Sequence, residues 1–500
     1  MRKSPGVTFS VLNLDLWIAH CSSDDHSEMR AGNNDKVIQT AQVFEPGKGV
    51  KGLEVTEDHW KLQCNVMVEV WTYNGRNDGP EIEVRRGDRV IILNKNDLNH
   101  PKTLHVHGEP VPNDMDGLPG NTQEAIDPGN NETYEEANNL PGTYWYHSHQ
   151  DPNTWIDRGL YGHDIVEPWD KEDYDTDFNP VGDERNHMNR GIQDDLSEMD
   201  HGDMRHTGND GMEHASMDNE MYDPFLINGK WPDGLEAIRV RRGEDVELRE
   251  VNAGPETQHN HILAHELKVS NPDGQPLNTP DFVRDTAQPI APHERYDYEG
   301  LNDRPGRWVY RDSNEPRQYD IPAILDEVGS KLPREDDPLT DNLSREEDNT
   351  TYGRDKDPST LNATDEYEMT LSPEEDNGVE TINGKLFPND ELNEVDDRDK
   401  LKANFINHGD FDHPMHLHGP FFRVPSDDGK NIPGSPWKKD TLNIDPGESY
   451  EWLFDRTNPG IWMFHCHDIH HASNTMVDET DYDEFDILHN PRPEIPNMPD

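Results

Sequence analysis

The amino-acid sequence predicts an all-β fold built from three repeated Greek-key β-sandwich domains. Short runs rich in Val, Ile, Tyr, Trp and Phe alternate with Gly, Pro, Asn and Asp, a pattern typical of antiparallel sandwiches. An Asn-Gly-basic turn occurs at residues 74–76, 228–230 and 383–385, at spacings of 154 and 155 residues. This period indicates three copies of one unit in the 500-residue chain.

Two further signals recur in the same order in every unit. One is a histidine, at position 105, 261 or 416, and the other is a Pro-Gly turn with an aromatic strand, beginning at Pro141, Pro305 or Pro459. Between the units lie acid-rich segments poor in β-branched residues, which we interpret as linkers. The predicted division is an N-terminal segment 1–40, domain 1 at 41–170, a linker at 171–222, domain 2 at 223–335, a linker at 336–365, domain 3 at 366–490 and a tail at 491–500.

The net charge restricts both the partners and the surface of the protein. There are 45 Lys and Arg against 104 Asp and Glu, which gives −59 and excludes nucleic acid as a partner, because nothing would neutralise its phosphates. Apolar residues make up only 31%, so the composition alone allows either disorder or a halophile-like acidic surface. The 11 Trp, 15 Tyr and 13 Phe favour the folded alternative, with repulsion that salt would screen.

The N-terminus has the outline of an export signal. Met1, Arg2 and Lys3 precede an apolar stretch that runs from residue 7 to residue 19 and ends near Cys21, although Asn13 and Asp15 interrupt it. An extracytoplasmic location is therefore expected. No apolar run reaches the length of about 18 residues that a transmembrane helix needs. We also expect the protein to be a monomer.

The chain has three cysteines, Cys21, Cys64 and Cys466, so at most one disulfide can form. Pairing of Cys21 with Cys64 stays an open question. A scaffold that depends on many disulfides is excluded.

Histidines gather in four short clusters. The clusters are His105-Val106-His107, His147-Ser148-His149, His413-Pro414-Met415-His416-Leu417-His418, and His465-Cys466-His467 continuing through His471 to Met476. Side chains alternate along a strand, so a His-x-His motif places two imidazoles on one face about 7 Å apart, suitable for metal ions held between facing strands.

The fourth cluster indicates copper. Alternation turns Cys466 away from His465 and His467, so its thiolate can hold one metal while its neighbours hold others. One Cys, two His and a weak Met form the blue-copper arrangement, which Cys466, His413, His471 and Met476 can supply. A single His-x-His is more often a pair of surface imidazoles. Four clusters that supply ten candidate ligand histidines, out of 26 in the chain, reverse that expectation.

These four motifs, in this order on a three-unit chain, resemble the multicopper oxidase family, specifically three-domain laccases and bacterial and archaeal cuprous oxidases. The resemblance covers about residues 50 to 490 and implies cupredoxin-like domains and four copper ions. It implies a type 1 copper at His413, Cys466 and His471 with Met476 axial, and a type 2 copper at His105 and His416. The implied type 3 pair has as ligands His107, His147, His149, His418, His465 and His467.

The resemblance also implies the reaction. A donor would lose one electron near type 1 copper, Cys466 would pass it on, and the trinuclear cluster between domains 1 and 3 would reduce O₂ to water. A laccase that oxidises phenols or aromatic amines is the first reading, and an oxidase of Cu(I) or another metal ion for copper tolerance is the second. A non-enzymatic copper or electron-transfer protein is the third, and the eight further histidines argue against it.

The family places a proton-relaying carboxylate after its first motif, which matches Asp116 here. Asp114 competes with it, and either could serve only as a turn residue. A second acidic position of the family is His470 in this chain, which puts that relay in doubt. Val106 replaces a frequent Trp and should alter packing but not ligation.

Domain 2 matches the repeat but not the ligand positions. Gln258, Leu263 and Arg311 stand where ligands would fall, so His261 is expected to be structural. We expect domain 2 to hold the other two domains together and to have no complete copper site.

The linker between domains 1 and 2 is rich in methionine and histidine. Six of the 15 Met lie between residues 187 and 221, with four His, and thioether is a soft ligand suited to Cu(I). Binding of Cu(I) and a flexible acidic loop with incidental Met are both left open.

Overall fold

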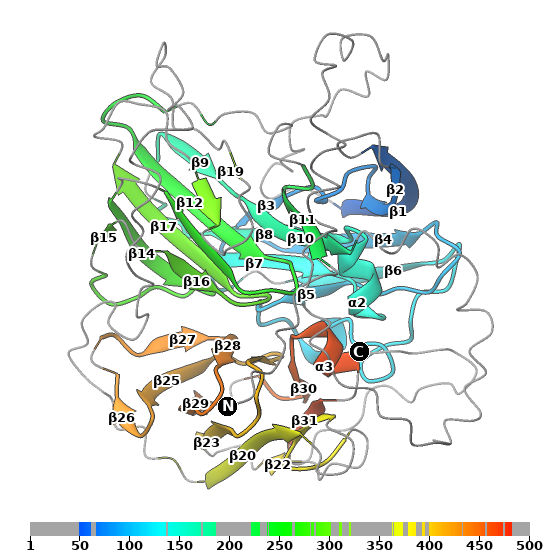
Figure 1. Ribbon diagram of the computed structural model, residues 1–500. Helices are drawn as coiled ribbons and strands as arrows, with labels where there is room; N and C mark the ends of the chain where they lie inside the picture. The colour runs from blue at the N-terminus through cyan, green and yellow to red at the C-terminus, as the bar shows by residue number, and fades with distance from the viewer. Residues whose placement is uncertain are drawn as a thin grey trace, which may run out of the picture.

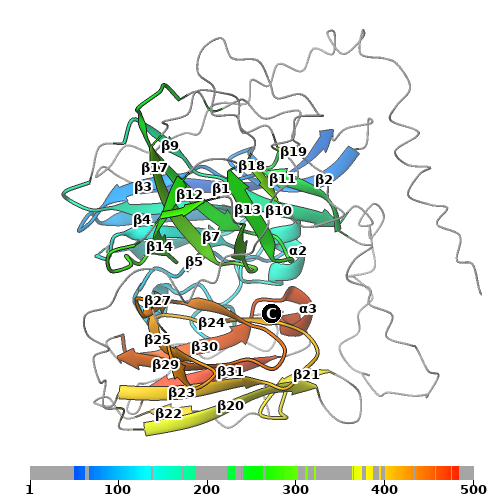
Figure 2. The same ribbon diagram turned by 60° about the vertical axis from the view of Figure 1, so that its left-hand side comes forward.

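The computed structural model describes most of residues 50–186, 222–321 and 363–482, with short gaps inside each range. The described chain forms three two-sheet units (Figure 1), one blue to cyan, one green and one yellow to red. Domains 1 and 2 lie side by side, and domain 3 packs beneath both in either view (Figure 2). The predicted all-β class is confirmed, since strands dominate the described elements.

Domain 1 is a sandwich of two four-stranded sheets, in the orders β2-β1-β4-β6 and β3-β8-β7-β5. Alternating burial along β4 shows how its period of two places one face on the core. The strands are β1 (Val50–Lys61), β2 (Met67–Tyr73), β3 (Ile82–Arg85), β4 (Val90–Asn96), β5 (His105–His107), β6 (Asn131–Glu136), β7 (Gly142–His147) and β8 (Tyr161–Glu167). The short helices η2 (Asn113–Met115) and α2 (Pro152–Asp157) follow β5 and β7.

Domain 2 pairs a seven-stranded sheet, β11-β10-β12-β17-β14-β15 with β9 beside β12, with a four-stranded sheet, β16-β13-β18-β19. Its strands are β9 (Thr176–Phe178), β10 (Val181–Asn186), β11 (Tyr222–Ile227), β12 (Asp245–Asn252), β13 (Gln258–Ile262), β14 (Glu266–Pro272), β15 (Phe282–Arg284), β16 (Gln288–Ile290), β17 (Arg295–Leu301), β18 (Tyr310–Asp312) and β19 (Asp320–Ile321).

The first part of the predicted linker 171–222 is corrected by these strands. Both β9 and β10 pair in parallel with β12, and β10 also pairs with β11. Composition misled the prediction because backbone hydrogen bonds hold these strands, the acidic side chain of Asp177 is exposed on β9, and Val181 is buried.

Domain 3 has the sheets β21-β20-β23-β29-β25-β26, with β27 beside β25, and β22-β31-β30-β24-β28. Its elements are β20 (Asp365–Pro373), β21 (Glu380–Ile382), β22 (Asn393–Val395), β23 (Lys400–Asn407), β24 (His413–Leu417), β25 (Phe422–Asp427), β26 (Lys430–Asn431), β27 (Trp437–Lys439), β28 (Thr441–Ile444), β29 (Ser449–Asp455), β30 (Ile461–Cys466), α3 (Ile469–Ser473) and β31 (Val477–Tyr482). Helix α3 contacts α2 of domain 1.

The repeated Asn-Gly turns have one geometry in all three domains. Asn74, Asn228 and Asn383 have φ of 56°, 49° and 54°, and each following glycine also has positive φ. Asn and Gly tolerate this left-handed region, so the repeat read from the sequence is also a repeat of backbone conformation.

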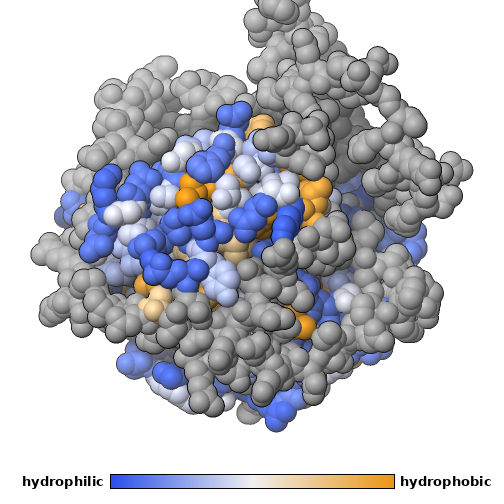
Figure 3. Space-filling view, turned by 90° about the horizontal axis from the view of Figure 1, so that it is seen from below, coloured by the Kyte–Doolittle hydropathy of each residue, from blue (hydrophilic) through white to orange (hydrophobic). Residues whose placement is uncertain are grey.

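The described surface is largely polar, as the charge predicts. In the face seen from below (Figure 3), the coloured residues are mostly hydrophilic, with separate hydrophobic patches. The exposed large hydrophobic residues of the described chain are Trp169, Phe282 and Phe411.

Several predictions fall outside the described residues. These are the export signal, Cys21 and Cys64, the methionine-rich segment from 188 to 221, and most of the second linker. No helix within the described parts is long and apolar enough to cross a membrane. The extracytoplasmic location and the monomeric state stay predictions.

Candidate metal centre

Four strands carry the histidine motifs to the boundary between domains 1 and 3. In domain 1, β5 and β7 run antiparallel with His105 opposite His147. In domain 3, β24 and β30 run antiparallel with His416 opposite His465. Because alternate side chains share a face, each pair of strands presents its imidazoles toward the other domain.

The eight imidazoles expected at a trinuclear site meet across this boundary. The rings of His107 and His416 stack with centroids 3.8 Å apart, and those of His105 and His418 stack at 4.3 Å. His149 of domain 1 lies 5.3 Å from His465 of domain 3, measured between ring centroids. Residues more than 300 positions apart in the sequence therefore form one group, which we call the histidine group.

Within the histidine group, potential ligand atoms gather into smaller sets, each with all its atoms within 4.8 Å of one another. Two of these sets are His149 with His418 and His465, and His105 with His416 and His418. A third combines His107, His147 and His467 with a histidine from domain 2, His293.

Hydrogen bonds hold one nitrogen of many rings and leave the other directed inward. Nδ1 of His105 donates to the Asp116 carbonyl at 2.8 Å, and Nδ1 of His416 donates to the Asp440 carbonyl at 2.9 Å. His147 makes the same bond to the Ser148 carbonyl at 3.0 Å. The opposite nitrogens, Nε2 in all three, are buried and have no hydrogen-bond partner within the described part of the chain.

Such orphaned nitrogens fit a metal centre. Fixing one ring nitrogen through a neighbouring acceptor sets the tautomer and directs the other nitrogen at the ion. Burial lowers the pKa of His107, His147 and His467 well below the usual range, so these imidazoles are neutral, the form that binds metal.

A second group lies on the other side of β30. Sγ of Cys466 is 3.7 Å from Nδ1 of His413 and 3.8 Å from Nδ1 of His471. Met476 is fully buried, and its carbonyl accepts the Cys466 amide at 3.2 Å. Burial raises the pKa of the Cys466 thiol, so forming a thiolate there requires a cation such as a bound metal. We call these four residues the cysteine group.

The two groups are joined by consecutive residues. Cys466 is buried in the apolar core of domain 3, while His465 and His467 belong to the histidine group. The covalent chain thus connects the two groups through one residue on each side of Cys466.

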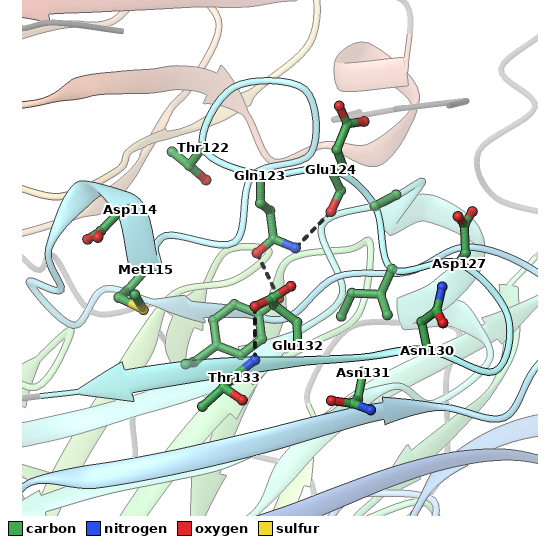
Figure 4. A pocket seen from close by; sticks show the side chains of 13 residues that line it. Asp114, Met115, Thr122, Gln123, Glu124, Asp127, Asn130, Asn131, Glu132 and Thr133 are labelled. Carbon is green, nitrogen blue, oxygen red and sulfur yellow. Dashed lines mark hydrogen bonds between the residues drawn. The ribbon is translucent and has the colours of Figure 1, made fainter. Parts of the chain in front are cut away.

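The structure separates the two candidate carboxylates. Asp116 is 1% exposed, and its Oδ2 accepts Nδ1–H of His418 at 2.9 Å. His418 and His105 together hold the pKa of Asp116 below its usual range, although burial alone would raise it. Asp114 is exposed and lines a pocket of about 540 Å³ beside β6 (Figure 4).

The backbone after Asp116 explains its position. Gly117 has φ of 77°, and a Cβ there would lie 1.8 Å from the Leu104 carbonyl oxygen. Only glycine permits this close approach, which folds the loop over β5 and turns Asp116 inward.

A second buried carboxylate, Asp440, was not predicted from the sequence. Its Oδ1 accepts Nε2–H of His107 at 3.2 Å, and Arg295 of domain 2 donates two bonds of 2.6 Å to its two oxygens. Burial would raise the pKa of Asp440, but Arg295 holds it well below the usual range. In the sequence Asp440 stands in the run Lys439-Asp440-Thr441, which has no pattern typical of metal ligands and therefore gave no reason to single it out.

His293 was also missed by the sequence prediction, which assigned no metal-site residue to domain 2. It stands alone in a turn, without a His-x-His partner. The side chains of His261, His470 and Arg311 lie outside the described residues, whereas Gln258 is buried and bonded to Asn252 at 2.8 Å. Val106 is buried in the core of domain 1, as its alternation with the ligands predicts.

Comparisons with known proteins agree with this geometry. Two regions, residues 54–171 and 354–484, match family models described as multicopper oxidase. Multicopper oxidase MmcO of Mycobacterium tuberculosis is 27% identical over 454 residues, covering 83% of this chain and 84% of that protein. Multicopper oxidase mco of Staphylococcus epidermidis is 25% identical over 479 residues, covering 91% and 94%. The crystal structure of a multi-copper oxidase from Pseudomonas thermotolerans aligns with a TM-score of 0.67 and 21% identity, covering 89% of this chain and 100% of that chain.

Fold and site together define a copper-dependent oxidoreductase built from cupredoxin-like domains, as the sequence predicted. The chain belongs to the multicopper oxidase family. The family implies copper as the cofactor and O₂ with a reducing substrate as the reactants.

Proposed function

We propose that the protein is a laccase-type oxidase with phenols or aromatic amines as electron donors. Four donors each lose one electron, and one O₂ takes up these four electrons and four protons to give two molecules of water. A phenol that gives up an electron also releases its hydroxyl proton. The observation that carries the proposal is the position of Cys466 between His465 and His467, which links the two groups through the shortest covalent path.

Copper bound at both groups would supply the one-electron redox steps and the binding of O₂. In this proposal His413, Cys466, His471 and Met476 would hold one type 1 ion. His105 and His416 would hold one type 2 ion. The type 3 pair would have as ligands His107, His147, His149, His418, His465 and His467.

Asp116 is proposed as the proton carrier of the histidine group. Its carboxylate accepts Nδ1–H of His418, so it lies one side chain away from the inward nitrogens. Asp114 is exposed and belongs instead to the wall of the surface pocket. The Asp116 carboxylate can pass protons to the histidine group while it orients His418.

The proposed donor site is the surface edge of the cysteine group. The His471 side chain is 14% exposed, and Phe411, 45% exposed, lies 5.7 Å from it between ring centroids. An exposed aromatic ring beside the edge of a ligand imidazole favours a flat aromatic donor, which can pack against Phe411 while it reaches His471.

A metal-ion donor such as Cu(I) is the second candidate, because carboxylates surround the same edge. Asp468 Oδ2 lies 3.7 Å from Nδ1 of His471, and the carboxylate of Asp412 also interacts electrostatically with the His471 side chain. Carboxylates attract cations, and the net charge of −59 adds a field of the same sign.

Oxygen uptake by the copper-loaded protein tests the proposal. We expect blue visible absorption and O₂ consumption with a methoxyphenol, and a Phe411→Ala variant should raise KM for the phenol without changing the blue colour. A preference for Cu(I) over the phenol, unaffected by Phe411→Ala, would favour the metal-ion oxidase. A blue protein that consumes no O₂ with either donor would refute both.

A further inference from the structure

A histidine of domain 2 projects into the histidine group. His293 lies in the turn between β16 and β17 and is fully buried. Its ring centroid is 3.8 Å from that of His467 and 6.1 Å from that of His107. Trp145 of domain 1 packs against the same ring, edge to face, at 4.9 Å.

The threefold repeat shows what residue this position normally holds. In each domain a Pro precedes a residue with positive φ: Gly129 (81°), His293 (71°) and Gly447 (86°). The amide of each donates to the carbonyl of an asparagine, Asn96, Asn252 or Asn407, at 2.8 to 3.0 Å. Each of these asparagines in turn donates from Nδ2 to the carbonyl of Ile126, Ile290 or Ile444.

His293 therefore replaces a glycine of the repeat at a position that disfavours side chains. A left-handed conformation costs free energy in any residue with a Cβ. Residues held in this region collect at functional sites, where the surrounding structure imposes them. The two sister turns show that the fold itself needs no side chain there.

The ring nitrogens of His293 have no other bonds to make. Neither Nδ1 nor Nε2 has a hydrogen-bond partner in the described structure, although the residue is fully buried. A buried imidazole without a partner is costly unless something else binds it. One of its nitrogens lies within 4.8 Å of the ligand nitrogens of His107, His147 and His467.

A bound ion would satisfy this set. Ligand nitrogens bind a first-row ion such as zinc at about 2.0–2.1 Å, so two nitrogens on opposite sides of such an ion are about 4 Å apart. The four nitrogens lie within 4.8 Å of one another, so they would draw slightly closer together to share one ion.

The neighbouring residues fix His293 in place. Arg295, two positions later, is fully buried, and its guanidinium donates two hydrogen bonds to the carboxylate of Asp440 in domain 3. The Arg295 amide is held by Asp273 Oδ1 at 3.0 Å, and the same carboxylate accepts the amides of Asp440 and Thr441. The turn is thus anchored to the strand that supports the histidine group.

We propose that His293 is a fourth imidazole ligand of one ion of the type 3 pair, the one that His107, His147 and His467 would hold. This inference rests on the proposed function and adds domain 2 to the metal centre. It makes the type 3 pair unequal, because the second ion keeps the three imidazoles of His149, His418 and His465. The four-imidazole ion should be the one that leaves the protein more slowly.

Copper retention by the folded holoprotein tests the inference. His293→Gly removes the imidazole and restores the residue that domains 1 and 3 carry, so the turn keeps its conformation. During dialysis against a copper chelator, we expect this variant to lose one ion at least about tenfold faster than the wild type, because removing a group that supports a metal ion typically lowers the affinity by at least that factor. The blue absorption of the cysteine group should stay unchanged.

A second test variant and a control variant complete this experiment. His293→Asn keeps a residue that tolerates positive φ but offers no imidazole, and it should match the glycine variant. His163→Asn removes another buried imidazole, on β8, and should retain copper like the wild type.

The outcomes separate this inference from the function on which it rests. If both His293 variants retain all copper as the wild type does, His293 is structural and the inference is wrong. If the wild type binds copper at the cysteine group alone, the proposed oxidase fails, and the inference fails with it.

Discussion

Domains 1 and 3 approach the metal centre with strands, whereas domain 2 approaches it with a turn. The outer domains use paired strands, in which backbone register places His105 opposite His147 and His416 opposite His465. Domain 2 lacks these motifs and reaches the same point with His293 and Arg295, which stand two residues apart. The difference teaches that a repeat without the ligand motif can still contribute to a shared site through the loop that docks there.

Each outer domain also supplies a carboxylate that bonds to a histidine of the other outer domain. Asp116 of domain 1 bonds to His418 of domain 3, and Asp440 of domain 3 bonds to His107 of domain 1. Only the second of these carboxylates is bonded to the guanidinium of domain 2, Arg295. Asp440 therefore serves as a fixed anion between the three domains, and Asp116 is the better candidate for carrying protons.

The largest effect is expected at the residue that joins the two metal groups. Cys466→Ser replaces the thiolate by a hydroxyl that stays protonated and binds copper weakly. We expect loss of the blue colour and of turnover by more than about a thousandfold, with copper in the histidine group and the fold retained. Visible absorption, copper analysis and O₂ uptake check this, and turnover near the wild-type rate would contradict the path through Cys466.

The next largest effect concerns the anchor of domain 2. Arg295→Met leaves Asp440 buried without its cation, which should cost about 3–5 kcal/mol. The melting temperature should fall by several degrees. Arg241→Met is the matched control, because Arg241 pairs with Glu244 at the surface and its loss should cost about 0.5 kcal/mol or less. Equal melting temperatures for the two variants would show that domain 2 is held by other contacts.

Much of this comparison could be predicted from the sequence, because its signals are local. The repeated turns, the His-x-His motifs and the position of Cys466 depend on strand alternation, which neighbouring residues reveal. The roles of Arg295 and Asp440 could not be predicted, since they arise from the docking of surfaces 145 residues apart in the chain.

The unusual position of His293 could have been recognised from the sequence only by aligning the repeated turns. Aligning Ala291-Pro292-His293-Glu294 with Asp445-Pro446-Gly447-Glu448 exposes a histidine in place of a turn glycine. The strands β9 and β10 were missed for a different reason, because short acidic strands resemble linkers in composition.

A smaller effect should separate the two acidic residues near η2. Asp116→Asn keeps an acceptor for Nδ1–H of His418 but cannot carry a proton, so turnover should fall by about a hundredfold. Copper content and blue colour should be unchanged. Asp114→Asn changes an exposed carboxylate and should leave turnover within about twofold of the wild type. Steady-state O₂ uptake checks both, and equal losses would remove the distinction between them.

The smallest effect separates surface charge from the buried anchor of domain 2. With a net charge of −59, repulsion between surface carboxylates weakens when added salt shortens the screening length to about 3 Å at 1 M. The melting temperature should therefore rise by a few degrees in molar salt. The pair of Arg295 and Asp440 is buried and is screened far less, so Arg295→Met should gain the same few degrees as the wild type. Thermal unfolding of both proteins across a salt series measures this. A difference between them that closes as salt rises would mean that water reaches the pair and that domain 2 is held to domain 3 by a surface interaction.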